Sequence, residues 1–193
     1  ESIDASLRAL GTDHVDVLFL HEVSDQAVLD QVMGEDGAFP AVLAAKEAGK
    51  ARYLGLSMHG WCEPLLSAID RYPFDVVMHT FNYFDRCNFP TGEGVLLPRC
   101  LERGIGVVGM KAFADGYLYR SIEPALRYAL TLPLSTMVVG ANTMPMLETD
   151  LAIAESFEPM NDADVQGLLR NAPELGKYVC RQCGKCLPAP DGV

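Results

Sequence analysis

The chain has 193 residues, of which 49 % are hydrophobic and 21 % charged, and its formal net charge at pH 7 is −11. This length and composition predict one globular unit with a sizeable core. The negative charge argues against nucleic acid and against an anionic membrane surface as partners, because both repel an acidic chain. No apolar run is long enough to span a bilayer, and a chain of this size needs no disulfides, so we expect a cytoplasmic location.

Apolar strands alternate with amphipathic helices along the whole chain. The opening segment, 1–13, has a helical pattern, and the first strand, VDVLFLH at 15–21, is apolar enough to be buried on both faces. Glycines 49 and 104 are expected to end two of the helices, and Ser121 and Asn161 to precede two others. The remaining expected elements are strands at 51–57, 74–82, 105–113 and 136–142, and helices at 38–48, 62–72, 94–103, 122–132, 145–157 and 162–170.

This alternation predicts an α/β protein whose parallel strands are joined by crossover helices. No G-x-G-x-x-G follows a strand, which weakens an open dinucleotide-binding sheet. Five strands are too few for a complete eight-stranded barrel of about 250 residues. We therefore expect a partial (β/α)8 TIM barrel, about strands 4–8, over residues 1–158. Residues 159–193 would form a helix and a cysteine segment.

Polar residues follow several of the expected strands, at the barrel edge where chemistry is usually located. His21 comes directly after an apolar run, so it is a satisfied core histidine, a group that donates to a substrate oxygen, or a proton relay. Lys111 either pairs with a carboxylate or binds an anionic ligand. The other polar residues of this set are Ser57, His59, Asn82 and Asn142, each of which could also simply cap a strand, and Phe81 stands beside Asn82.

Five segments, in order, resemble the latter portion of an aldo-keto reductase. They are SLRALGTDHVDVLFLH, AGKARYLGLSMH, FDVVMHTFNYFDR, ERGIGVVGMKAF and STMVVGANTMPMLETDLA. The resemblance implies hydride transfer between NAD or NADP and a small carbonyl or alcohol substrate. The catalytic histidine of that family matches His21. Its Asp, Tyr and Lys belong to earlier strands and are absent here, so the resemblance implies that this chain alone is an inactive fragment.

The resemblance also implies a cofactor site along the strand ends. Ser57 matches a residue that holds the carboxamide, whereas Met58 and Met78 replace its Asn and Gln partners, and Met110 replaces an aromatic residue that stacks on nicotinamide. Met146 stands where the NADP-binding arginine would lie, and no basic residue occurs between positions 128 and 169, which favours NAD or a weak selectivity between the two cofactors. The expected cofactor-binding residues are Ser57, Asn82, Met110, Lys111, Gly140, Asn142 and Thr143.

Three cysteines near the end of the chain, Cys180, Cys183 and Cys186, have ferredoxin-type spacing. They resemble the 4Fe-4S tail of one branch of the family, but Ala189 occupies the position before Pro190 where a fourth cysteine is expected. A cubane cluster would need a fourth ligand from Cys62, Cys87, Cys100 or another segment. A three-iron cluster, a zinc site or a tail that has lost its metal are the other interpretations.

Two further functions are kept beside the reductase hypothesis. The first is an iron–sulfur or metal-binding electron-transfer module, with its own electron-transfer partner, on a barrel scaffold. The second is a barrel that binds a phosphorylated metabolite through Lys111 and the start of the helix at 145.

Overall fold

Five parallel strands form one curved sheet. The computed structural model describes the backbone of residues 2–178 and the side chains of residues 2–172. The strands pair in sequence order, and Leu20 lies beside Leu56, Thr80 beside Met110, and Met110 beside Val138. The carboxyl ends of the strands therefore lie along one edge. The strands are β1 (Val15–Leu20), β2 (Ala51–Ser57), β3 (Val76–Thr80), β4 (Gly106–Met110) and β5 (Thr136–Val138).

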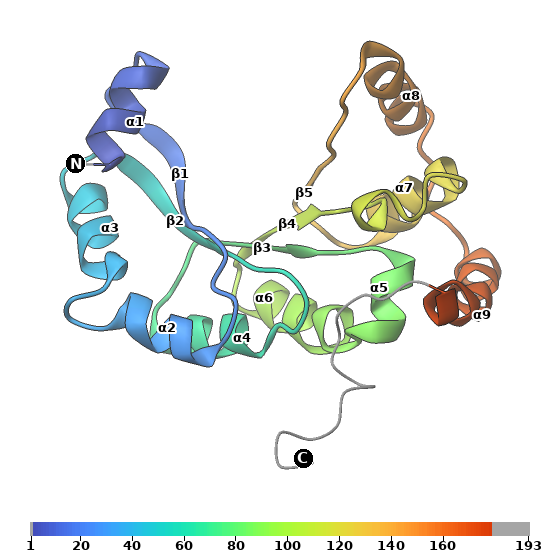
Figure 1. The fold of residues 1–193 in the computed structure, drawn as a ribbon, viewed down its shortest axis with the longest axis horizontal. Helices are drawn as coiled ribbons and strands as arrows, with labels where there is room; N and C mark the ends of the chain where they lie inside the picture. Colours follow the sequence, from blue (N-terminus) through green and yellow to red (C-terminus); the bar gives the residue numbers. More distant parts are fainter. Residues whose placement is uncertain (1, 179–193) are drawn as a thin grey trace.

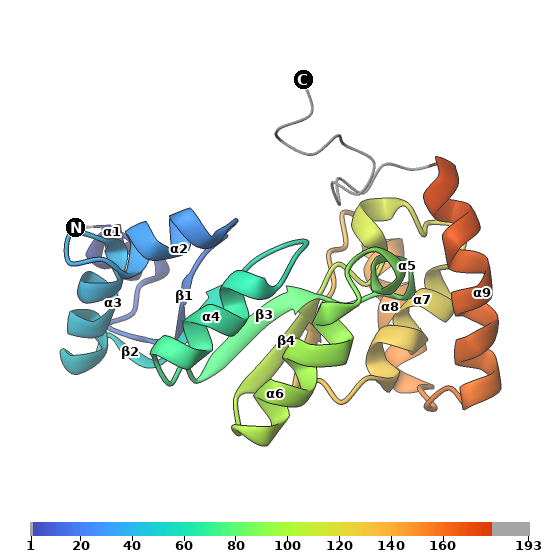
Figure 2. The same ribbon diagram turned by 90° about the horizontal axis from the view of Figure 1, so that it is seen from below.

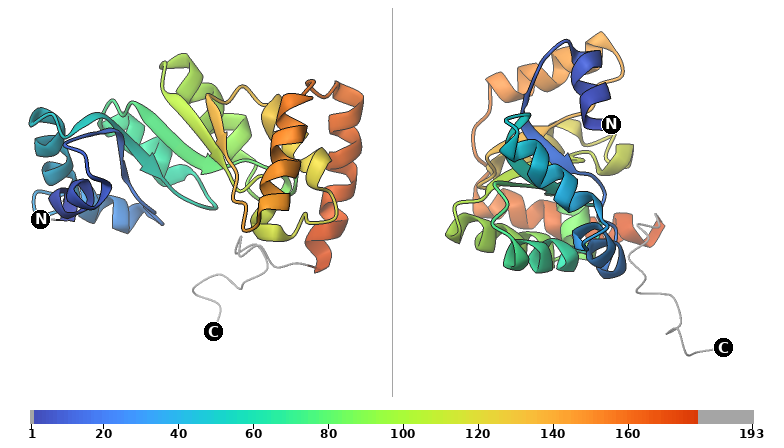
Figure 3. Two further views of the ribbon diagram at one scale, coloured as in Figure 1. Left: turned by 90° about the horizontal axis from the view of Figure 1, so that it is seen from above. Right: turned by 90° about the vertical axis from the view of Figure 1, so that its left-hand side faces the viewer.

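The helices lie on the convex side and at the two ends of an open arc (Figure 1). The arc has the shape of part of a TIM barrel, and the described residues do not close it, as the other views show (Figures 2 and 3). The helices are α1 (Ser2–Leu10), α2 (Gln26–Met33), α3 (Ala38–Glu47), α4 (Glu63–Arg71), α5 (Tyr83–Asn88), α6 (Leu97–Glu102), α7 (Ile122–Thr131), α8 (Met144–Glu155) and α9 (Asp162–Tyr178), with a π-helix η1 (Gly92–Leu96) and a 3-10 turn η2 (Ala114–Gly116).

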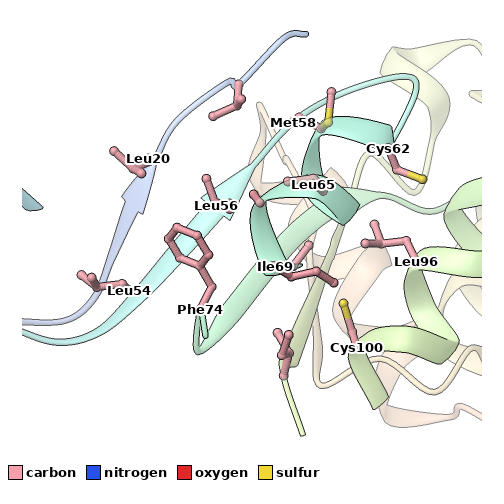
Figure 4. Close-up of a cluster of buried hydrophobic side chains, with 14 of the residues drawn as sticks. Leu20, Leu54, Leu56, Met58, Cys62, Leu65, Ile69, Phe74, Leu96 and Cys100 are labelled. Carbon is pink, nitrogen blue, oxygen red and sulfur yellow. The ribbon is translucent and has the colours of Figure 1, made fainter. Parts of the chain in front are cut away.

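The core lies between the sheet and the helices outside it. Leu54, Leu56 and Val77 are fully buried there, and Leu65 of α4 and Cys100 of α6 pack into the same cluster (Figure 4). Because side chains alternate along a strand, the neighbours of these residues face the concave side. No described segment covers that face.

The concave face is correspondingly exposed. The side chain of Tyr53 is 51 % exposed, and that of Val138 is 51 % exposed. The prediction that the first strand is buried on both faces was wrong, since Val15, Val17 and Phe19 are only half-buried. The cause is that β1 is an edge strand of the described sheet and faces an open concavity.

Sequence signals at helix ends were mostly confirmed. Gly49 and Gly104 follow α3 and α6 with φ of +74° and +69°, a conformation that glycine adopts without steric cost. Asn161 accepts a hydrogen bond from the amide of Asp164 near the start of α9. Ser121 occupies the N-cap position of α7, but its side chain makes no capping hydrogen bond.

Several element boundaries differ from the prediction. Helix α2, capped by Asp25, was not predicted, nor was α5, which begins where Asn82 turns the chain away from β3. Strand β5 has only three residues, because the described chain offers residues 139–142 no strand to pair with beyond Val138. The last helix extends past residue 170 to Tyr178 and packs against α5 through Ala172. Across residues 2–178, none of the helices has the length and apolar character that crossing a membrane requires.

Candidate functional site at the strand ends

A pocket of about 560 Å³ lies at the carboxyl edge of the sheet. Its walls come from the segments that follow β1, β2, β3 and β4, which the parallel register brings together. It contains an imidazole, aromatic rings and carboxylates. Among the lining residues are Glu22, His59, Trp61, Asp85, Asp115 and Tyr117.

His21 is exposed at the end of β1, so the interpretation as a core histidine was wrong. The turn after it is tied to β2: the amide of Glu22 donates to Ser57 Oγ (3.2 Å), and that of Val23 donates to the Ser57 carbonyl (3.0 Å). Glu22 has a φ of +55°, which is costly for a residue with a Cβ. These two bonds hold the turn and thereby set the direction of the chain beside His21. The imidazole borders a separate pocket of about 390 Å³ next to α1 and α3.

Asn82 joins the ends of β3 and β4. Its Oδ1 accepts from the amide of Asp85 (2.7 Å), and its Nδ2 donates to Asp85 Oδ2 (2.8 Å) and to the Lys111 carbonyl (3.0 Å). The side chain is almost fully buried. Asn82 therefore has a clear structural task in addition to the cofactor role expected from sequence.

Met110 and Lys111 lie together where β4 ends. Met110 is buried, and its carbonyl accepts from the amide of Phe81 (3.1 Å). Lys111 has a φ of +60°, and its ammonium lies 2.7 Å from Asp115 Oδ1. An anionic ligand at Lys111 would thus compete with an existing carboxylate.

The three remaining expected residues follow β5. Gly140, Asn142 and Thr143 are exposed, and Thr143 Oγ1 accepts from the amide of Met146 (3.4 Å) to cap α8. The structure thus links the ends of β1 and β2 and those of β3 and β4 by hydrogen bonds, whereas this loop stands apart from the 560 Å³ pocket.

His79 was missed by the sequence analysis. It lies in β3 on the helix side of the sheet, is 1 % exposed, and its Nδ1 donates to the Met58 carbonyl (3.2 Å). Burial lowers the pKa of His79 to about 4, so the ring is neutral near pH 7. No local sequence pattern distinguishes it, since its burial arises from the packing of β3 against Gly92 of η1.

A partly buried polar triad lies next to this histidine and was also missed. The hydroxyl of Tyr128 donates to the Glu93 carboxylate (2.7 and 2.8 Å), and Arg86 Nη1 lies 3.1 Å from that hydroxyl and 3.2 Å from Glu93 Oε2. Burial raises the pKa of Glu93, and its two partners offset part of that effect. The π-helix η1 presents Glu93 to α5 and α7, and π-helical turns often occur near functional sites.

The terminal cysteines Cys180, Cys183 and Cys186 lie outside the described residues. Two of the proposed fourth ligands, Cys62 and Cys100, are fully buried in the core, and burial raises the pKa of Cys100 to about 11. Both are therefore poor ligands for a cluster, and Cys87 is the half-buried alternative. In the part of the chain that the structure describes, no three His, Cys, Asp or Glu side chains are placed to hold a metal ion.

Replacing His79 with glutamine is expected to remove a pH dependence of stability. At pH values between 6.5, the ordinary pKa of histidine, and about 4, the pKa of His79 in the folded protein, the ring is protonated in the unfolded chain but neutral in the native one. Falling pH should therefore lower the free energy of unfolding of the wild type, by up to about 3 kcal/mol more than that of the variant. Urea unfolding at about pH 7 and about pH 4 measures this difference. His14→Gln, at a partly exposed site, should keep the wild-type dependence, and equal slopes for the wild type and His79→Gln would contradict the assignment.

Known proteins match this chain in sequence. The family model described as "Aldo/keto reductase family" matches residues 1–129. L-galactose dehydrogenase from Arabidopsis thaliana is 31 % identical over 195 residues, which covers 83 % of this chain and 59 % of that protein. Versiconal hemiacetal acetate reductase from Aspergillus parasiticus is 28 % identical, over 84 % of this chain and 45 % of that protein. The chain therefore spans less than two thirds of the length of these relatives.

Solved structures match the fold. The aldo-keto reductase AKR11C1 from Bacillus halodurans superposes with a TM-score of 0.68 in both its apo and holo forms, at 21 % identity, over 88 % of this chain. The match covers 66 % of the apo chain, as expected for an incomplete arc of the same barrel. The superposition shows the shared fold, and the match of the family model to residues 1–129 shows that the chain belongs to the aldo/keto reductase family.

Proposed function

We propose that the whole protein is a NAD(P)-dependent oxidoreductase that transfers hydride between nicotinamide and a small carbonyl or alcohol substrate. The observation that carries this proposal is the match of residues 1–129 to the family, on a sheet whose strand ends converge at one edge. A cytoplasmic location fits the acidic chain and the free thiols of Cys62 and Cys100.

In this proposal His21 acts on the substrate oxygen. It is exposed at the strand-end edge, and its turn is fixed by Ser57. A neutral imidazole can donate a hydrogen bond to a carbonyl oxygen, and a protonated one can donate a proton. The Asp, Tyr and Lys expected from the family would come from a part of the protein outside these 193 residues, so the chain alone is proposed to be inactive.

The described residues fit NAD(P) in part. Nicotinamide would supply or accept the hydride. Ser57, Asn82, Met110 and Lys111 would lie toward that ring, although Asn82 and Lys111 already have partners. Gly140, Asn142 and Thr143, with the start of α8, would hold the adenosine phosphate end through backbone N–H groups.

The charge near α8 favours NAD over NADP. Glu148 is exposed in this helix, Asp150 is buried in it, and no basic residue occurs between positions 128 and 169. A 2′-phosphate would therefore meet the Glu148 carboxylate without a compensating cation.

Full-length protein should bind NADH about tenfold or more tightly than NADPH, because NADPH carries a 2′-phosphate that no nearby cation would neutralise. Fluorescence titration of the reduced nicotinamide measures both dissociation constants. Binding of neither dinucleotide would overturn the proposed function, whereas tighter binding of NADPH would overturn only the cofactor preference.

Replacing His21 with asparagine in the full-length protein should lower kcat by about 100-fold or more, since general acid–base groups contribute on that order. Steady-state turnover with a panel of small aldehydes and ketones measures the effect. His14→Asn is the matched control, because His14 is also partly exposed but pairs with Asp13 at the other end of β1. A variant at position 21 with wild-type kcat would contradict the catalytic role.

We also propose, as a second function, that Cys180, Cys183 and Cys186 bind an iron–sulfur cluster that exchanges electrons with a partner. The spacing of these cysteines is the observation that favours it, and Ala189 leaves the fourth ligand to come from elsewhere.

Anaerobic reconstitution with iron and sulfide, followed by iron counting and EPR of the reduced protein, tests this second proposal. We expect three or four irons per chain, and their loss in Cys183→Ser. Cys87→Ser, at a half-buried thiol, is the control. This variant should keep its iron if the cluster is held without Cys87, and lose it if Cys87 is the fourth ligand. An iron-free product from the wild type would contradict the proposal.

A further inference from the structure

A small cavity of about 10 Å³ lies directly beneath the strand-end pocket. The two share four wall residues, Gly60, Thr80, Asp85 and Phe89, so the cavity forms part of the pocket floor. The rest of its lining comes from β3, α5 and η1, namely His79, Asn82, Arg86, Gly92 and Glu93.

One nitrogen on the wall of this cavity, Nε2 of His79, receives no hydrogen bond from the described residues. Nδ1 of His79 donates to the Met58 carbonyl, so the neutral ring carries its proton there and Nε2 is an acceptor. The ring is 1 % exposed, and no hydrogen bond to Nε2 comes from the described residues. An acceptor at this depth is stable only where it meets a donor, and a water molecule can supply one.

Gly92 keeps this edge of the ring open. A Cβ at position 92 would lie 3.0 Å from Nε2 and 3.1 Å from Cδ2 of His79, closer than ordinary van der Waals contact. Glycine therefore leaves the space next to Nε2 free, and the cavity occupies that region.

The size and polarity of the cavity match one water molecule. Its volume is about that of a single water-sized sphere. The walls offer acceptors from His79, Asp85 and Glu93, and donors from the Thr80 hydroxyl and the Arg86 guanidinium. Water can donate twice and accept twice, whereas an ammonium ion cannot accept from Arg86 and an apolar atom would leave Nε2 unpaired.

We propose that this cavity is a binding site for one internal water molecule, which donates one hydrogen bond to His79 Nε2 and the other to a carboxylate of the wall. The water links β3 to α5 and η1 and extends the Arg86–Glu93–Tyr128 triad to the floor of the strand-end pocket. This site requires neither the dinucleotide nor the cluster.

A high-resolution crystal structure of the full-length protein tests the site directly. We expect one ordered water within hydrogen-bonding distance of His79 Nε2, and long-range 1H–15N NMR should show the proton of that ring on Nδ1. An empty cavity, a cavity filled by a protein atom, or a ring protonated on Nε2 instead would each overturn the proposal.

Paired glycine variants provide the control. Gly92→Ala should lose the water, because its Cβ enters the space beside Nε2, whereas Gly94→Ala in the same π-helix has no atom within 4 Å of its new Cβ and should keep it. Should Gly92→Ala not fold, His79→Phe removes the acceptor and is expected to lose the water as well. Retention of the water at full occupancy in these variants would show that Nε2 does not hold it and would overturn the proposal.

Discussion

The parallel register of the sheet is the constraint on which the rest of the structure depends. Since β1 to β5 all run in one direction and pair in sequence order, each residue that follows a strand falls at the same edge. Residues far apart in sequence, such as His21 and Lys111, therefore contribute to one side of the molecule. The apolar strands provide the driving force by burying one face against the helices, and the polar strand ends are positioned as a consequence.

Hydrogen bonds between neighbouring strand ends then fix this edge locally. Ser57 holds the turn after β1, and Asn82 holds the chain after β4. Glu22 and Lys111 both adopt positive φ, and the bonds to Glu22 N–H and to the Lys111 carbonyl stabilise these strained positions. Beneath them, the Arg86–Glu93–Tyr128 triad pairs a largely buried carboxylate with a cation and a hydroxyl, which offset the cost of its desolvation.

Much of this arrangement was predictable from sequence because strand and helix periodicity is strong in this chain. The five strands, their parallel order and the polar strand ends were all predicted. Helix α5 was not, because FNYFDR continues an apolar strand, and only the capping geometry of Asn82 ends that strand. His79 and the triad depend on contacts between β3, η1 and α7, and such long-range contacts have no signature in a local pattern.

The exposed concave face connects the fold with the comparisons. Tyr53 and Val138 are half exposed on the open arc, and the chain spans 59 % of L-galactose dehydrogenase. We propose that further strands of the whole protein cover this face and bring the missing catalytic groups to the same edge. That would complete the site next to His21 without any change in the register of β1 to β5.

A crystal structure of the full-length protein with NADH bound tests the central claim, that the strand-end edge is the hydride-transfer site, most directly. The account predicts that the nicotinamide ring lies at the carboxyl ends of β1 to β4, with Ser57 and Met110 near it and His21 facing the substrate side. A nicotinamide ring bound away from this edge would contradict it.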